Sequence, residues 1–144
     1  QETYSGWLKS QGEENPQTLM AANNYTSSLI NLQRFEEAKA LLRKIIPVAR
    51  RVPGECDSLT LKMRSMYASA LYMDPAATLD DLREAVTTLE EVERIARRVM
   101  GGAHPLITEI ERSLRNGRAA LAARVGGGVS SVCEGVAAMT AKGA

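Results

Sequence analysis

The ten residues "ARRVPGECDS" at positions 49–58 return, little changed, as "ARRVMGGAHP" at positions 96–105. In both stretches an alanine and two arginines precede a glycine, and Asp57 or His104 follows that glycine three positions later. Internal similarity at a spacing of some 20–50 residues is typical of proteins built from stacked repeats. The fold of this chain is therefore predicted from the repeat outward.

The similarity extends well beyond these two phrases. The segment "GEENPQTLMAANNYTSSL" from Gly12 aligns without a gap with "GECDSLTLKMRSMYASAL" from Gly54, a step of 42 residues. Further on, "RFEEAKAL" from Arg34 corresponds to "LDDLREAV" from Leu79 once five extra residues are allowed. The second step, from Gly54 to Gly101, is therefore 47 residues. A third copy opens at Gly101 and contains only its first helix.

Each unit is predicted to be a helix, a turn and a second helix. Asn15, Asp57 and His104 precede the first helices at the N-cap position, and Pro16 and Pro105 occupy the first helical position, where a missing N–H costs nothing. Apolar residues then recur at helical spacing. In the first helix, from Pro16 to about Leu32, they are Leu19, Ala22, Leu29 and Leu32. In the second, from Phe35, they are Ala38, Leu41, Leu42, Ile45, Ile46 and Ala49. In its copy, from Leu79, they are Leu82, Ala85, Val86, Leu89, Val92, Ile95, Ala96 and Val99.

The repeated phrase itself is predicted to be the end of one helix followed by the cap of the next. Gly54 and Gly101 tolerate the left-handed dihedral angles that often end a helix. The arginines before them oppose the negative end of the helix dipole, which favours a solvated, dipole-matched face over a binding patch. These arginines are Arg50, Arg51, Arg97 and Arg98.

These patterns predict an all-α stack of about two and a half repeats with a C-terminal tail. Residues 1–11 are expected to be an N-terminal cap, the end of a preceding helix. The repeats are expected at 12–53 and 54–100, with a half repeat at 101–124. Residues 125–144 are expected to form a glycine-rich joint at "GGG" and a short helix from Val132 to about Thr140, or a tail.

The first unit resembles the tetratricopeptide repeat of the kinesin light chain type. The resemblance rests on the 42-residue step, the "NPQTL" and "HPLIT" openings, the interior alanines Ala38 and Ala85, and above all "AANNYTSSLINLQRFEEAKALL". It covers residues 12 to about 124 and weakens along the chain. It implies a right-handed α-solenoid of antiparallel helix pairs, whose first helices line a concave groove for a peptide or partner segment.

The resemblance also implies which residues lie in that groove. Asn23 and Asn24 match the asparagine pair of the family, and an amide can both donate to and accept from an extended peptide backbone. The pair is absent from later units, where Ser65 and Met66, then Arg112 and Ser113, take its place. The predicted partner-binding residues are Asn23, Asn24, Ser27, Asn31, Lys62, Ser65, Glu109, Arg112 and Asn116. The alternative is that Asn23 and Asn24 bond locally or face water.

Composition narrows the classes of function. Eighteen basic and 17 acidic side chains leave no large net field to attract nucleic acid or an anionic membrane. No stretch approaches the roughly 18 apolar residues of a membrane-spanning helix. Cys56 and Cys133 have neither metal-ligand spacing nor a predictable pairing. His104 is explained as a cap, and the glycines at 126–128 lack the flanking strand of a phosphate loop. We expect no catalytic residue, metal or cofactor.

The sequence thus predicts a noncatalytic adaptor or scaffold that binds a protein or peptide partner. The alternative is a structural subunit of a large complex, buried against its neighbours. Because the chain begins at Gln1 and holds an incomplete array, we expect it to be part of a larger chain or assembly. A cytoplasmic location is the default, and an organellar one is the alternative if a targeting segment has been removed.

Overall fold

The computed structural model describes residues 6, 8, 12, 14–101 and 104–132 of the 144-residue chain. The elements are α2 (Pro16–Asn31), α3 (Phe35–Ala49), the π-helical turn η1 (Arg50–Gly54), α4 (Ser58–Met73), α5 (Leu79–Met100) and α6 (Pro105–Val132). The predicted all-α class is confirmed, and no strand occurs among the described residues. None of the helices in this part of the chain combines the length and apolar character needed to cross a bilayer.

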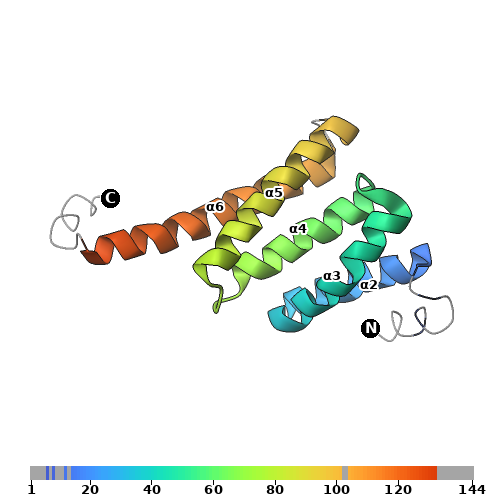
Figure 1. Cartoon of the computed structure of the whole chain (residues 1–144), viewed down its shortest axis with the longest axis horizontal. Helices are drawn as coiled ribbons and strands as arrows, with labels where there is room; N and C mark the ends of the chain where they lie inside the picture. Colours follow the sequence, from blue (N-terminus) through green and yellow to red (C-terminus); the bar gives the residue numbers. More distant parts are fainter. Residues whose placement is uncertain (1–5, 7, 9–11, 13, 102–103, 133–144) are drawn as a thin grey trace.

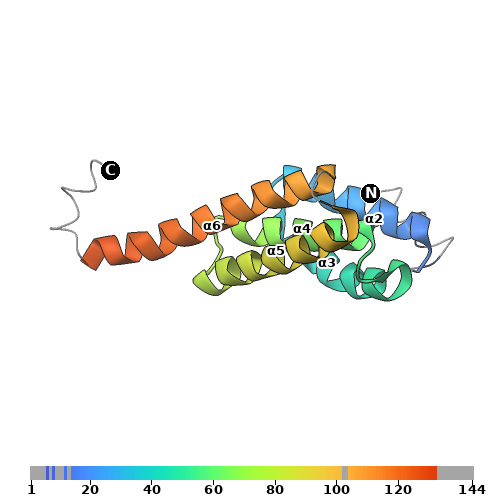
Figure 2. The ribbon, with the colours of Figure 1, turned by 90° about the horizontal axis from the view of Figure 1, so that it is seen from above.

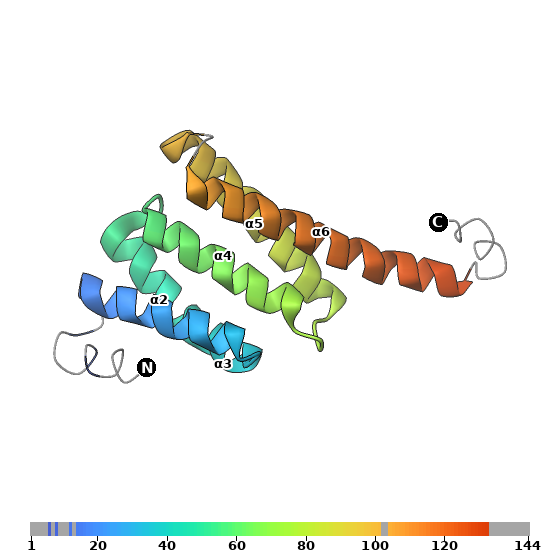
Figure 3. The ribbon, with the colours of Figure 1, turned by 180° about the vertical axis from the view of Figure 1, so that it is seen from behind.

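Consecutive helices run in opposite directions, so that alternate helices share a side of the molecule. Helices α2, α4 and α6 lie next to one another on the side seen in Figure 3, and α3 and α5 lie behind them. Figure 1 shows the opposite side, with α3 and α5 in front, and Figure 2 shows both rows from above. Each helix packs against its neighbours along the chain, and α4 also contacts α2 and α6. Helix α4 is therefore the central element.

All three predicted N-caps are confirmed. The Asn15 Oδ1 atom accepts a hydrogen bond from the Gln17 amide at 2.8 Å, and the Asp57 carboxylate accepts one from the Leu59 amide at 2.9 Å. In the third unit the His104 Nδ1 atom accepts from the Leu106 amide at 3.0 Å. Each cap satisfies a backbone N–H that has no partner within its helix. The starts of α2, α4 and α6 are thus built alike.

Gly54 and Gly101, three residues before the second and third caps, have the left-handed backbone expected of them, and Gly12 before the first cap shares it. Their φ angles are 90° at Gly12, 114° at Gly54 and 82° at Gly101. At the end of α3 the structure adds a detail: the α-helix ends at Ala49, and the arginine-containing stretch to Gly54 is π-helical. The repeated phrase is therefore confirmed as a helix end followed by a cap, with a wider last turn in its first copy.

The core is aliphatic, as the composition predicts, and it continues from one helix pair to the next. The interior alanines Ala38 and Ala85 are fully buried. On α4, Met63 packs with residues of α2 and α3, whereas Leu61 and Leu71 pack with residues of α5 and α6. Burying one large aliphatic side chain stabilises the fold by about 1.5–3 kcal/mol. Helix α4 thus links two clusters that would each be small alone.

Three expectations at helix ends are wrong. Val99 was expected on the buried stripe of α5, but it is 49% exposed. Leu32 was expected on the buried stripe of the first helix, but it is 65% exposed. Helix α2 ends at Asn31, and the chain then reverses through Gln33, whose φ is 62°, so Leu32 points away from the core. The expected joint at residues 126–128 is also wrong, because α6 continues through these glycines to Val132. A long helix already formed extends more easily than a new one starts.

The two ends of the chain are described only in part. Of residues 1–11, Gly6 and Leu8 are described; both have helical backbone, and Leu8 packs against the cluster that contains Leu19. The predicted short helix from Val132 to Thr140 begins at the last residue of α6, and the rest of it lies outside the described residues. Cys133 lies outside them too.

Candidate functional site

A hollow of about 380 Å³ lies where the first halves of α2, α4 and α6 meet, on the side seen in Figure 3. We call it the groove. Helix α2 contributes three lining residues, α4 three and α6 with its cap four. They are Met20, Asn23, Asn24, Ser58, Leu59, Lys62, His104, Pro105, Leu106 and Glu109.

The repeat explains why these residues meet. Met20, Lys62 and Glu109 occupy the same position in the first, second and third units, because they follow one another by the same steps of 42 and 47 residues as the glycines. The caps at Asp57 and His104 fix where α4 and α6 begin, which places Ser58 and Pro105 at the edge of the groove. Equivalent positions of successive first helices therefore form one continuous surface.

Asn23 has the most unusual environment in the groove. The residue is 7% exposed, and its Oδ1 atom is buried without a hydrogen-bond partner. A buried polar atom left without a partner costs about 1–3 kcal/mol. Asn24, beside it on α2, is exposed. The pair therefore presents one buried amide whose carbonyl is unsatisfied and one amide that is exposed in the groove.

The groove is polar without being strongly charged. Lys62 on α4 and Glu109 on α6 are both exposed and carry opposite charges. Leu59 and Leu106 contribute apolar surface at the helix starts, and Met20 is 53% exposed. Such a lining can hold a ligand by hydrogen bonds and by apolar contact at once. It has no excess of either sign that would attract a polyanion.

The structure brings together four of the nine residues predicted for partner binding. Asn23, Asn24, Lys62 and Glu109 all line the groove. The remaining five lie elsewhere on α2, α4 and α6. Ser27, Asn31, Arg112 and Asn116 are exposed but do not line the groove, and Ser65 is buried on α4.

The apolar residues of the lining were not among those predicted from the sequence. Met20 shares the repeat position of Lys62 and Glu109, so the register alone would have found it. His104 was assigned only a capping role, and that role is confirmed. Its place at the edge of the groove follows from the contact between α4 and α6, which no local pattern predicts.

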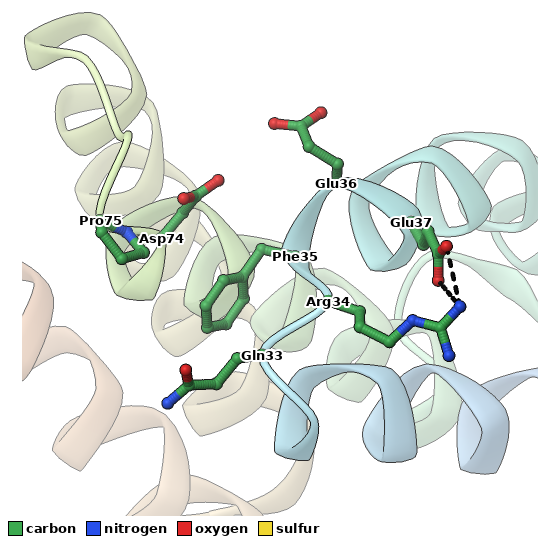
Figure 4. A pocket seen from close by; sticks show the side chains of 7 residues that line it. All are labelled: Gln33, Arg34, Phe35, Glu36, Glu37, Asp74 and Pro75. Atoms are coloured by element: carbon green, nitrogen blue, oxygen red, sulfur yellow. Dashed lines mark hydrogen bonds and ion pairs between the residues drawn. The ribbon is translucent and has the colours of Figure 1, made fainter.

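A second hollow, of about 370 Å³, lies at the turns that join α2 to α3 and α4 to α5 (Figure 4). Its charged residues already have partners. Arg34 and Glu37 form an ion pair of 2.7 Å, drawn in Figure 4, and Asp74 accepts a hydrogen bond from Lys39 at 3.2 Å. Phe35 is buried beneath them. This arrangement holds the turns together and leaves few groups for a ligand.

The Lys39 ammonium group is the buried charge in this region, with its side chain 5% exposed. Burial alone lowers its pKa, but hydrogen bonds to Glu36 and Asp74 outweigh that effect and hold the pKa above its ordinary value of 10.5. The stabilisation is therefore fully present below the pKa of an unfolded lysine, and it is lost only as the pH rises through the folded value. At neutral pH the charged Lys39 and Asp74 side chains therefore stabilise the turn.

Among the residues that the structure describes, no three His, Cys, Asp or Glu side chains are grouped closely enough to hold a metal ion. Cys56 is exposed and is a free thiol. Comparisons of the chain with protein-family models, with curated proteins and with solved structures give no match. The groove and its residues are therefore the basis for the function proposed below.

Proposed function

We propose that this chain is a noncatalytic adaptor that binds an extended segment of a partner protein in the groove between α2, α4 and α6. The observation that carries the proposal is Asn23, whose side chain lines the groove while its buried Oδ1 atom has no hydrogen-bond partner. A native protein rarely leaves such an atom unsatisfied unless a ligand or water completes it. A small rotation of the amide would let a bound backbone N–H do so.

The amide pair suits an extended backbone. A primary amide carries two donors and a carbonyl acceptor, which is the pattern needed to bond a peptide N–H and a peptide C=O together. Asn23 and Asn24 offer two such groups on consecutive residues of α2. Recognition through the peptide backbone gives affinity that depends little on the partner's sequence.

The rest of the lining sets the preferred side chains of the partner. Lys62 would pair with an acidic side chain and Glu109 with a basic one. The Met20 side chain is flexible and adapts to apolar groups of different shape. We therefore expect the bound segment to carry an apolar residue flanked by charges of both signs.

We also propose that the helices form about two and a half tetratricopeptide-like repeats, as the resemblance to the kinesin light chain type implies. This is supported by the steps of 42 and 47 residues, by left-handed glycines at equivalent positions and by three equivalent caps. The contacts of α4 with both α2 and α6 also agree with a stack in which each unit packs on the next.

A library of displayed random peptides, selected on the immobilised chain, tests the proposal. The Kd of a selected peptide is then measured for the wild type, for the double variant Asn23→Ala, Asn24→Ala and for Lys62→Ala. We expect each groove variant to raise the Kd about tenfold or more, because central interface residues carry most of the binding free energy. Circular dichroism checks that helicity is retained.

Lys44→Ala is the matched control for Lys62→Ala. Both lysines are exposed, but Lys44 lies on α3 and does not line the groove. The control should leave the Kd unchanged. Selected peptides that bind the groove variants as tightly as the wild type would contradict the proposal.

A structural subunit of a large assembly is the second candidate, and one observation favours it. The C-terminal half of α6 extends past α4 and α5 (Figures 1 and 3), where Val125 is 45% exposed. Leu121 of this half still packs against the core, and the stretch of α6 that follows it is suited to contact a neighbouring subunit. Size-exclusion chromatography of native extract separates the candidates, because a subunit migrates only with a large complex and loses that complex when residues 122–144 are deleted.

A further inference from the structure

A third hollow, of about 250 Å³, lies between α3 and α5 with α4 beneath, on the side seen in Figure 1. It shares no lining residue with the groove. Three of its lining residues are arginines, Arg43, Arg50 and Arg64, and the only carboxylate among them is Glu84. The volume is below the roughly 300–1,000 Å³ of a site for a drug-sized ligand, so it suits a small group.

Arg64 is the residue that points to a ligand. Its side chain is 8% exposed, and its Nη2 atom lies 3.2 Å from the Glu91 Oε1 atom. Its Nη1 atom is buried without a hydrogen-bond partner, and the Oε1 atom of Glu55 lies 4.0 Å from it. A buried guanidinium whose N–H groups are not all bonded is costly. An acceptor placed in the hollow would remove that cost.

The other two arginines also have donors to spare. Arg43 donates from Nε to the Tyr67 hydroxyl at 3.3 Å, and its guanidinium lies 5.8 Å from the centre of the Tyr67 ring. In the described part of the chain, no carboxylate forms an ion pair with Arg43. Arg50 donates from Nε to Glu55 at 2.7 Å. A guanidinium has five N–H donors, so each of these arginines can bond a further acceptor.

We propose that this hollow, lined by Arg43, Arg50 and Arg64, binds a single oxyanion group, a phosphate or a carboxylate. Guanidinium groups bond the oxygens of both through paired N–H donors. Phosphate is the better match, because its oxygens point in several directions and the three arginines come from α3, η1 and α4. Glu84 opposes binding, and Glu55 and Glu91 weaken the field, so the affinity for a free anion is modest.

Nuclear magnetic resonance of the arginine Nε–Hε groups tests this directly. The chain is titrated with inorganic phosphate, and separately with acetate, at an ionic strength held constant with sodium chloride. We expect saturable shifts of the Arg43, Arg50 and Arg64 signals with phosphate. Saturation by acetate at similar concentrations would assign the site to carboxylates as well. No saturable shift with either anion would overturn the proposal.

Substitutions of exposed residues test whether each charged side chain favours or opposes phosphate binding, without disturbing the core. Arg43→Gln should weaken phosphate binding about threefold, and Glu84→Gln should strengthen it about threefold, as expected for single exposed charges. Arg83→Gln is the matched control: Arg83 is exposed on α5, pairs with Asp80 and does not line the hollow. Equal phosphate affinity in all three variants would show that the shifts do not come from this site and would overturn the proposal.

Discussion

The Thr60 hydroxyl donates a hydrogen bond of 3.0 Å to the carbonyl oxygen of Ala49, and both residues are fully buried. The bond spans η1 and ties the first turn of α4 to the last residue of α3. It therefore holds the start of the second repeat against the end of the first, across the π-helical turn.

Thr60→Val keeps the volume of the side chain and removes this bond, so we expect it to lower the free energy of unfolding by about 1 kcal/mol or more. Thr26→Val is the control. The Thr26 hydroxyl donates to the Ala22 carbonyl within α2, at 2.8 Å, and links no separate elements. Urea denaturation should show a smaller loss for Thr26→Val; equal losses would contradict the role assigned to Thr60.

Glycine substitutions should act in opposite directions at two positions. Gly117 lies within α6, and a Cβ atom there would meet Tyr72, Leu89 and Val86 atoms at 3.5–3.7 Å, which is ordinary contact. Gly117→Ala should therefore stabilise the fold by about 0.5–1 kcal/mol.

Gly54→Ala has space for its Cβ atom, but the φ of 114° is strained for alanine, so this variant should be destabilised by about 1–3 kcal/mol. Thermal denaturation compares the two variants with the wild type. A shift of Tm in the same direction for both would contradict the backbone described for these glycines.

Lys39 and Asp74 should be strongly coupled in their contributions to the free energy of unfolding. Their side chains are 5% and 12% exposed, so Lys39→Met leaves a nearly buried carboxylate without its cation. We expect that single variant to lose about 3 kcal/mol of its free energy of unfolding. The double variant Lys39→Met, Asp74→Asn should lose clearly less of this free energy, because it leaves no buried charge without a partner. Additive losses in a double-mutant cycle would mean that the two residues act independently.

Acid should remove part of the stability that Asp81 contributes at the start of α5. Asp81 accepts a hydrogen bond from the backbone amide of Thr78, and this lowers its pKa from the ordinary value of 3.8. A folded-state pKa below the unfolded one means that the stabilisation is present above about pH 4 and is lost as the pH falls through the lowered value. Asp81→Asn should remove this dependence, as judged by urea denaturation at pH 6 and pH 3.

Thr78 and Asp81 form a capping box, in which each side chain accepts a hydrogen bond from the other's backbone amide. If wild type and Asp81→Asn lose stability in parallel between these pH values, the capping box is not the source of the acid sensitivity. Thr78→Ala provides a second check, because the Asp81 amide loses the Thr78 hydroxyl as its acceptor. Loss of an N-cap side chain costs about 1 kcal/mol.

Local patterns in the sequence were sufficient to predict the helices and where each one starts. The caps at Asn15, Asp57 and His104 and the left-handed backbone at Gly54 and Gly101 depend on a few neighbouring residues, and all are confirmed. The burial of charged residues could not be predicted in this way. Lys39 is buried because Asp74, 35 residues later, is folded against it.

The groove could be predicted only in part, because repeat register is a local pattern and the packing of the helices is not. Repeat register places Lys62 and Glu109 at one position, and the structure brings them together with Asn23 and Asn24. Ser27, Asn31, Arg112 and Asn116 share these helices but fall outside the lining, which reaches no further than Asn24 on α2, Lys62 on α4 and Glu109 on α6. Where the helices meet depends on packing at α4, which no single helix encodes.

The most direct test of the central claim is an amide chemical-shift map of the labelled chain with a peptide selected against it. Binding in the groove predicts that the largest shifts fall on the first halves of α2, α4 and α6, including the side-chain amide of Asn23, and that α3 and α5 change little. Shifts centred on α3 and α5, or spread evenly over all helices, would contradict it.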